Sequence, residues 1–300
     1  MTSVSTSAFY ERANRDIGAL RSRAEDLQAA VGRGQRLARA SDDPVAAARL
    51  RRLTRTDQFV AIDTTNAARA MSDLQLTDAA LGSFAGYVTR IKELATQAAN
   101  GTLTASQRAG IGAEVQQLQG ELVRLANSRD SAGHALFGGE TAGAAYTLDA
   151  AGNAIYAGTT SAGDLPLGDG QSVTRGLTGP EFLNFAGTDL FAVTKALADA
   201  LTGASADPAQ AARDALSPLD TGLEAITTAQ TVVGTRMNWI DLNLERATRL
   251  SEMRSDEEAE VAGTDIAATV TELQEVMTVL EASQASFARL ASLSLFDMIR

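Results

Sequence analysis

The 300-residue chain contains no cysteine. Disulfide bonds, thiolate metal sites and cysteine nucleophiles are therefore excluded. Its single histidine, His134, cannot form a histidine-based metal cluster, and we expect it to pack in a turn. The chain has no run of about 18 apolar residues, so no membrane-inserted segment is predicted. Its first residues lack a basic stretch followed by an apolar core, so we expect no ordinary secretory signal.

Aromatic residues make up only 5% of the chain, although hydrophobic residues make up 45%. Alanine and leucine therefore supply most of the apolar content, which favours long packed helices over a β-rich core. The 37 acidic residues outnumber the 26 lysines and arginines, giving a net charge of −11. Because an acidic chain repels phosphate backbones, we expect no nucleic-acid partner.

Helical periodicity dominates both ends of the sequence. The first segment shows a heptad seam with spacings of three and four, at Tyr10, Ala13, Ile17, Leu20, Ala24, Leu27 and Val31. A second helix is predicted from Pro44 to about Ala99, with Asp43 as its N-cap. Thr104 and Gln107 predict a capping box for a third helix.

The later helices are predicted in three pieces. A short helix follows Pro208, and Ser217 with Pro218 begins a long one. The acidic run at 251–260 is expected to interrupt it. A last helix then covers roughly residues 264–298.

The middle of the chain has a different composition. Residues 132–207 hold 13 of the 25 glycines, and the helical period disappears there. Around YTLDAAGNAIYAG, the apolar runs at 146–148 and 155–156 flank a turn and predict a β-hairpin. The expected fold is thus mainly α with a small, separate β-rich insert. Five segments are predicted, namely an N-terminal assembly helix (1–43), the first half of a helical core (44–131), the insert (132–207), the second half of the core (208–250) and a C-terminal assembly helix (251–300).

The two ends carry opposite charge, with a net +4 over residues 1–60 and −7 over residues 251–300. Complementary charge and matching apolar seams suggest that the ends pair, within one molecule or between neighbours. A single helix buries too little to offset the entropy of ordering it. We therefore expect residues 1–35 and 265–300 to be mobile in the free monomer and to fold on assembly. The residues expected to carry assembly are Ile17, Leu20, Leu27, Val31, Leu280, Phe287, Leu290, Leu293 and Phe296.

Candidate chemistry is scarce. Asp42 and Asp43 form a carboxylate pair, but the following Pro44 favours helix capping over acid–base catalysis. The acidic run DEEAE is better explained as a solvated face than as a cation site. No glycine-rich loop ends in Gly-Lys-Ser or Gly-Lys-Thr, so no phosphate cradle is predicted. Met237 and Trp239 lie near the seam of a long helix and are expected in the core. The sequence predicts no enzyme activity and no cofactor.

Several motifs together resemble the flagellin superfamily and, within it, the hook-associated protein 3 group. The stretch GRGQRLARASDDPVAAARL contains Ser41, Asp42, Asp43 and Pro44, which are similar to the Ser-Asp-Asp-Pro signature of the family. VGTRMNWIDLNLER resembles a shared Gly-x-Arg-x-Asn segment, and SLSLFDMI resembles the family's ending. GTDLFA at 187–192 is similar to the point where the family's chain returns from its variable domain.

The resemblance implies a structural protein of the bacterial flagellum that joins hook to filament. It implies coiled coils from both chain ends, an outward-facing middle domain, and extracellular location after export without a cleaved signal peptide. The implied partners are copies of the chain in a ring, a neighbouring hook-associated protein, flagellin, and an export chaperone on the C-terminal helix.

Three alternatives remain open at this stage. The first is a filament flagellin, which SDDPVAA and the small insert disfavour. The second is a cytosolic coiled-coil scaffold, which would require stable pairing within one molecule. The third is a glycan-binding insert, for which the four tyrosines and one tryptophan of the chain are a poor supply.

Overall fold

The computed structural model describes residues 3–37, 39–130, 132–168 and 170–298. Within these ranges the side chains of residues 3–7, 9 and 291–298 are not described. The chain divides into two compact units, each of which is considered by itself. Residues 1–57 and 250–300 form the first, here called the terminal unit, and residues 58–249 form the second, the central unit. The bounds of the five expected segments stay a prediction, and the contacts group residues 44–57 with the chain ends.

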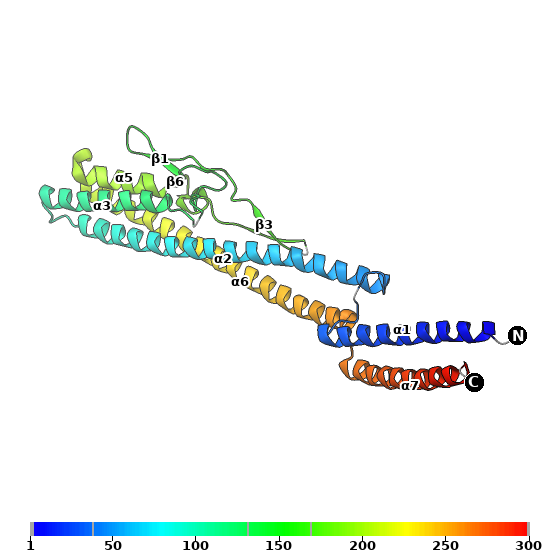
Figure 1. The fold of residues 1–300 in the computed structure, drawn as a ribbon. Helices are drawn as coiled ribbons and strands as arrows, with labels where there is room; N and C mark the ends of the chain where they lie inside the picture. Colours follow the sequence, from blue (N-terminus) through cyan, green and yellow to red (C-terminus); the bar gives the residue numbers. More distant parts are fainter. Residues whose placement is uncertain (1–2, 38, 131, 169, 299–300) are drawn as a thin grey trace. The chain divides into compact units, whose positions relative to one another are not determined.

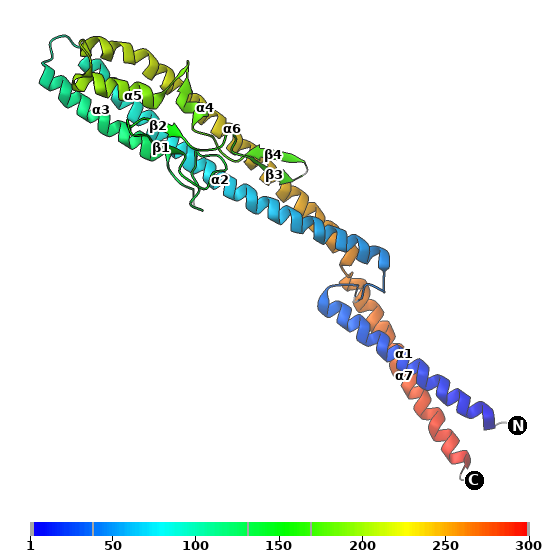
Figure 2. The same cartoon turned by 90° about the horizontal axis from the view of Figure 1, so that it is seen from above.

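The terminal unit contains two long helices that lie side by side (Figures 1 and 2). They are α1, Ser3–Arg33, and α7, Ile266–Met298. The unit also contains the first turns of α2, Pro44–Ala98, and the last turns of α6, Pro208–Ala262. Both ends of the chain thus belong to one compact unit, as their opposite charges and apolar seams suggested.

The central unit is a helical bundle with small antiparallel hairpins. Beside α2 and α6 it contains α3 (Ala105–Ala126), α4 (Pro180–Leu183), α5 (Leu190–Asp199) and the π-helical turn η1 (Ala200–Ala204). The strands pair as β1 (Tyr146–Leu148) with β2 (Ala154–Tyr156), β3 (Asp164–Gly168) with β4 (Gln171–Thr174), and β5 (Asn184–Phe185) with β6 (Thr188–Asp189). The mainly α fold with a small β-containing middle is confirmed, as is the predicted hairpin, in which Tyr146 pairs with Tyr156.

Two of the helix starts predicted from capping residues, those of α2 and α3, are present. The side chain of Asp43 accepts a hydrogen bond of 3.0 Å from the backbone N–H of Ala46. Thr104 and Gln107 form a reciprocal capping box at the start of α3, with each side chain accepting from the backbone N–H of the other. These starts follow from local chemistry, because a cap satisfies N–H groups that have no partner inside the helix.

The predicted breaks after Pro208 are wrong, because α6 is one helix of 55 residues. Pro218 lies inside it, and the residues around it, Ala215 and Leu219, are buried. Burial of this face outweighs the hydrogen bond that the proline cannot donate. The acidic run at 251–260 is also helical, since glutamate is a good helix former and no helix-breaking residue falls there.

The expectation of a separate insert is also wrong, because its apolar residues join the core of the helices. Phe137 and Phe182 pack around Phe84 of α2, with ring-centroid distances of 5.9 and 5.4 Å to Phe84 and 5.1 Å between them. All three side chains are fully buried. The segment expected to be β-rich also contains α5, which packs against α3. A stretch of about 75 residues with short strands gains stability by sharing a core.

We expect Phe84→Ala to lower the free energy of unfolding by about 3–5 kcal/mol, because it leaves a cavity among three rings. The matched control is Phe59→Ala on the same helix, where the ring is 62% exposed. That change should stay within about 0.5 kcal/mol. Urea unfolding of the full chain, followed by the fluorescence of its only tryptophan, Trp239 of the central unit, measures both. Equal losses in the two variants would contradict a core centred on Phe84.

Candidate assembly interface

The contact between α1 and α7 buries a narrow strip of apolar side chains. Ala24 and Leu27 of α1 and Leu280 of α7 are each 7–8% exposed. Ile17, Leu20 and Val31 are half-buried on the same seam. The heptad spacing places these side chains in one stripe, which is the pattern of a two-helix contact. Much of the remaining surface of both helices is exposed, so the seam is shallow.

An aromatic contact lies farther toward the chain ends. The rings of Tyr10 and Phe287 meet edge to face, with their centroids 5.5 Å apart. The hydroxyl of Tyr10 also donates to the backbone carbonyl of Leu290, at 3.4 Å. An edge-to-face pair contributes about 0.5–1.5 kcal/mol beyond its buried area. The sequence predicts a role for Phe287 in assembly, but nothing in it indicates Tyr10 as the partner.

Opposite charges meet across the same helices. Arg23 of α1 approaches Glu272 of α7 to 2.5 Å. Both side chains are about half exposed, so the pair adds little stability by itself. It does bring together the basic N-terminal and acidic C-terminal segments in the way their net charges suggested.

Backbone hydrogen bonds tie the chain just after α1 to the connection between α6 and α7. Gly34 adopts a positive φ of 66°, which lets the chain turn out of α1. The N–H of Arg36 then donates to the carbonyl of Ala262 at 2.8 Å, and the N–H of Thr264 donates to the carbonyl of Gly34 at 3.2 Å. Two segments more than 200 residues apart in sequence therefore form a short antiparallel bridge.

The Ser-Asp-Asp-Pro motif closes the turn that follows. Asp43 caps α2 and Pro44 is the first residue of that helix, while Asp42 accepts from the backbone N–H of Arg39 at 2.7 Å. The donation from Ala46 holds the pKa of Asp43 below its usual value, and Arg36, 3.5 Å away, acts in the same direction. The carboxylates of Asp42 and Asp43 thus accept hydrogen bonds from backbone N–H groups, as expected from the neighbouring Pro44.

Two further ion pairs connect the start of α2 with the end of α6. Arg49 meets Glu257 at 2.5 Å, and Arg254 meets Asp57 at 2.6 Å. The Arg254 side chain is only 14% exposed, and its Nη2 atom is buried without a partner among the described residues. Neither pair is predicted from the sequence, because nothing in the pattern of either helix indicates which distant residue a charged side chain meets.

The other predicted assembly residues have mixed environments. Phe287 is half-buried against Tyr10, and Leu290 is 45% exposed. The side chains of Leu293 and Phe296 lie outside those that the structure describes. The role of all nine residues in assembly stays a prediction.

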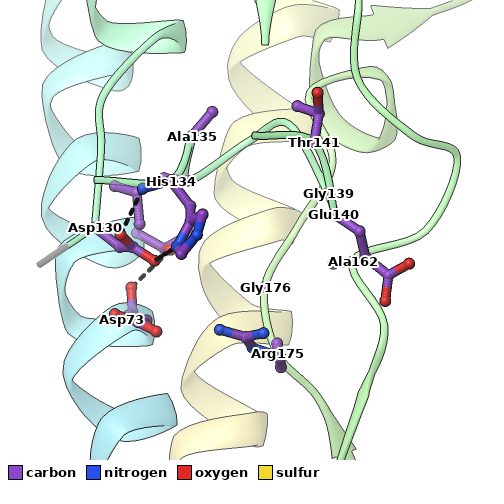
Figure 3. A pocket seen from close by; sticks show the side chains of 12 residues that line it. Asp73, Asp130, His134, Ala135, Gly139, Glu140, Thr141, Ala162, Arg175 and Gly176 are labelled. Carbon is purple, nitrogen blue, oxygen red and sulfur yellow. Dashed lines mark hydrogen bonds and ion pairs between the residues drawn. The ribbon is translucent and has the colours of Figure 1, made fainter. Parts of the chain in front are cut away.

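The only histidine lies in a turn, as expected. The N–H of His134 donates to the Asp130 carboxylate at 2.8 Å, and the N–H of Asp130 donates to the His134 carbonyl at 2.9 Å. The turn borders an open hollow of about 210 Å³, with Asp130, His134 and Asp73 gathered on one side and Glu140 on the other (Figure 3). Among the described residues, no three histidine, aspartate or glutamate side chains are placed to hold a metal ion.

The prediction for Trp239 is wrong, since 41% of this side chain is exposed. Met237 is partly buried against the core, as predicted. Positions two apart on a helix are rotated by about 200°, so only one of the two can face the core. None of the helices in the described ranges is both long and apolar enough to cross a membrane.

The chain is similar in sequence to known flagellar proteins. Residues 4–142 match the family described as bacterial flagellin N-terminal helical region. Flagellar hook-associated protein 3 of Escherichia coli (strain K12) is 25% identical over 290 residues, which is 88% of this chain and 89% of that protein. Flagellin FlaB1 of Treponema pallidum is 36% identical over 106 residues, 35% of this chain and 37% of that protein.

The fold has a counterpart among solved structures. A putative flagellar hook-associated protein from Vibrio parahaemolyticus superposes with a TM-score of 0.69 at 23% identity, covering 74% of this chain and all of that one. The family match and the hook-associated protein 3 relative confirm the resemblance to the flagellin superfamily and, within it, to hook-associated protein 3, and the solved structure shows that the fold is shared.

In the assembled protein, we expect Leu27→Asp to increase amide hydrogen exchange in α1 and α7 together by at least about tenfold, because burying a leucine is worth roughly 1.5–3 kcal/mol. Gln28→Asp places the same charge on the exposed neighbouring position and should change exchange little. Exchange in α3 serves as the internal reference. Faster exchange in α1 alone would show that the two helices do not protect each other.

Burial, followed by the charge of Asp130, raises the pKa of Asp73. The folded state therefore binds the carboxyl proton of Asp73 more tightly than the unfolded state does. The resulting stabilisation of the folded state is present at acid pH and is lost as pH rises through the raised pKa. Asp73→Asn should therefore raise the urea midpoint at pH 7 more than at pH 4, relative to Asp78→Asn on the same helix. In carboxyl NMR titrations, Asp130→Asn should bring the pKa of Asp73 back toward its ordinary value. No change in that titration would rule out Asp130 as a cause.

Proposed function

We propose that this chain, whose residues 4–142 match the bacterial flagellin N-terminal helical region, is a structural part of the bacterial flagellum that joins hook to filament. The observation that carries the proposal is the extent of the match to hook-associated protein 3, which runs through nine-tenths of both chains. The matching flagellin FlaB1 aligns with little more than a third of this chain. A filament subunit is the second candidate, and the higher identity of that shorter match is what favours it.

The terminal unit is the part suited to assembly. Its seam leaves exposed apolar side chains on α7, including Ile266, Met277 and Val279. In a ring of identical chains these side chains would be covered by neighbours, which offsets the cost of ordering both helices. We keep the expectation that residues 1–35 and 265–300 are mobile in the free monomer. Protease-resistant termini in dilute solution would argue against it.

The proposed role at the junction also implies where the chain acts and what it contacts. The chain acts outside the cell, at the junction, after export without signal cleavage. It contacts copies of itself, another hook-associated protein and flagellin, and a chaperone holds its C-terminal helix before export. It is not an enzyme and needs no cofactor. A cytosolic coiled-coil scaffold is favoured only by the pairing of α1 with α7 inside one chain.

We expect cells that lack this chain to carry bare hooks and to lose flagellin into the medium, because the filament has no junction from which to grow. Electron microscopy of the cells and immunoblots of the medium measure the two effects, with re-expression of the wild-type chain as control. Bare hooks without secreted flagellin would identify a filament subunit instead. Unchanged filaments would refute the flagellar role.

A further inference from the structure

Three arginines lie on the side of α2 that faces away from α6. Within the terminal unit, Leu53 is buried and Asp57 pairs with Arg254 of α6. The side of α2 that carries Leu53 and Asp57 therefore faces α6. Successive helical residues are rotated by about 100°. The intervening arginines therefore point outward, and all three are exposed. We call them the basic stripe, Arg51, Arg52 and Arg55.

Three acidic residues lie on the side of α6 that faces away from α2. Arg254 and Glu257 of α6 point toward α2, where they meet Asp57 and Arg49. The residues four apart along the far side of α6 are acidic and exposed. We call them the acidic stripe, Glu252, Asp256 and Glu260.

The two stripes therefore face in opposite directions, because each points away from the helix that carries the other. They lie at the same level along the helix pair, since the ion pairs Arg49–Glu257 and Asp57–Arg254 place residues 49–57 beside residues 254–257. Within the described part of the chain, none of the six side chains has a hydrogen-bond or ion-pair partner.

We infer that the basic stripe of one copy docks on the acidic stripe of the next. Each stripe has three charges of one sign, so the two are complementary in number as well as in sign. Because they lie on opposite sides, one copy can engage a neighbour on each side at once. Such a head-to-tail contact repeats around a ring or along a helix, whereas a two-fold dimer could not use both stripes in this way.

The common level of the stripes favours a ring, because neighbours need no shift along the helix axis to bring them together. Charge complementarity of this kind selects the partner and its orientation more than it adds affinity. The inference deepens the proposed function by naming the surface through which copies meet, and it rests on that function only for its place in the flagellum.

Two charge-reversed full-length proteins test the contact. One carries Arg51→Glu, Arg52→Glu and Arg55→Glu, and the other carries Glu252→Arg, Asp256→Arg and Glu260→Arg. Sedimentation velocity is measured for each alone, for their equimolar mixture and for the wild-type chain, up to about 1 mM, where even millimolar contacts are populated. A chain with lysine at positions 51, 52 and 55 is the matched control that keeps the charge.

We expect the wild type, the lysine control and the mixture to associate, and each reversed protein alone to remain monomeric, because like charges then face each other. Association should weaken as salt rises from 0.05 to 0.5 M, values spanning roughly a threefold change in screening length. A mixture no larger than its separate components would overturn the inference, as would association of the reversed proteins alone. Either result is independent of whether cells that lack the chain form filaments, and that separate experiment tests the proposed function.

Discussion

The terminal unit depends on the backbone bridge between residues 34–36 and 262–264, which joins segments from opposite ends of the sequence. Among the side chains that the structure describes, only Ala24, Leu27 and Leu280 are well buried on α1 and α7, which is too little to order either helix alone. The bridge brings the two helices together, and the heptad seam then buries what apolar surface there is. Burial alone does not specify which residues of α1 and α7 meet. The ion pair Arg23–Glu272 and the ring contact of Tyr10 with Phe287 favour one pairing of the two helices.

Local chemistry made much of this fold predictable from the sequence. Asp43 and Thr104 cap helices because of the residues within three positions of them, and the hairpin at 146–156 follows from its turn and alternating residues. Features that depend on distant contacts were not predictable. Pro218 reads as a helix start, yet burial on either side keeps α6 continuous. Phe137 and Phe182 lie in a glycine-rich segment, and only the folded chain places them against Phe84.

In the assembly interface too, features set by local sequence were predictable and those set by distant contacts were not. The seam positions Ile17, Leu20, Leu27 and Leu280 are recognisable because a heptad repeat can be read directly along one helix. Arg254 and Asp57 are not, since a partly buried ion pair between helices leaves no pattern in either segment. The sequence does not indicate a role for Gly34, whereas in the structure its positive φ lets the chain turn into the bridge. Charge alone could not separate the arginines that pair inside the chain from those that face outward.

The bridge also settles the axial register of α1 against α7. A heptad seam repeats every seven residues, so sliding one helix by two turns would restore most apolar contacts at little cost. The hydrogen bonds from Arg36 and Thr264 permit no such slide, because they fix the points from which both helices extend. Residues 3–33 and 266–298 therefore extend from a common point in one fixed register, so the length over which the two helices can pair is set at the bridge.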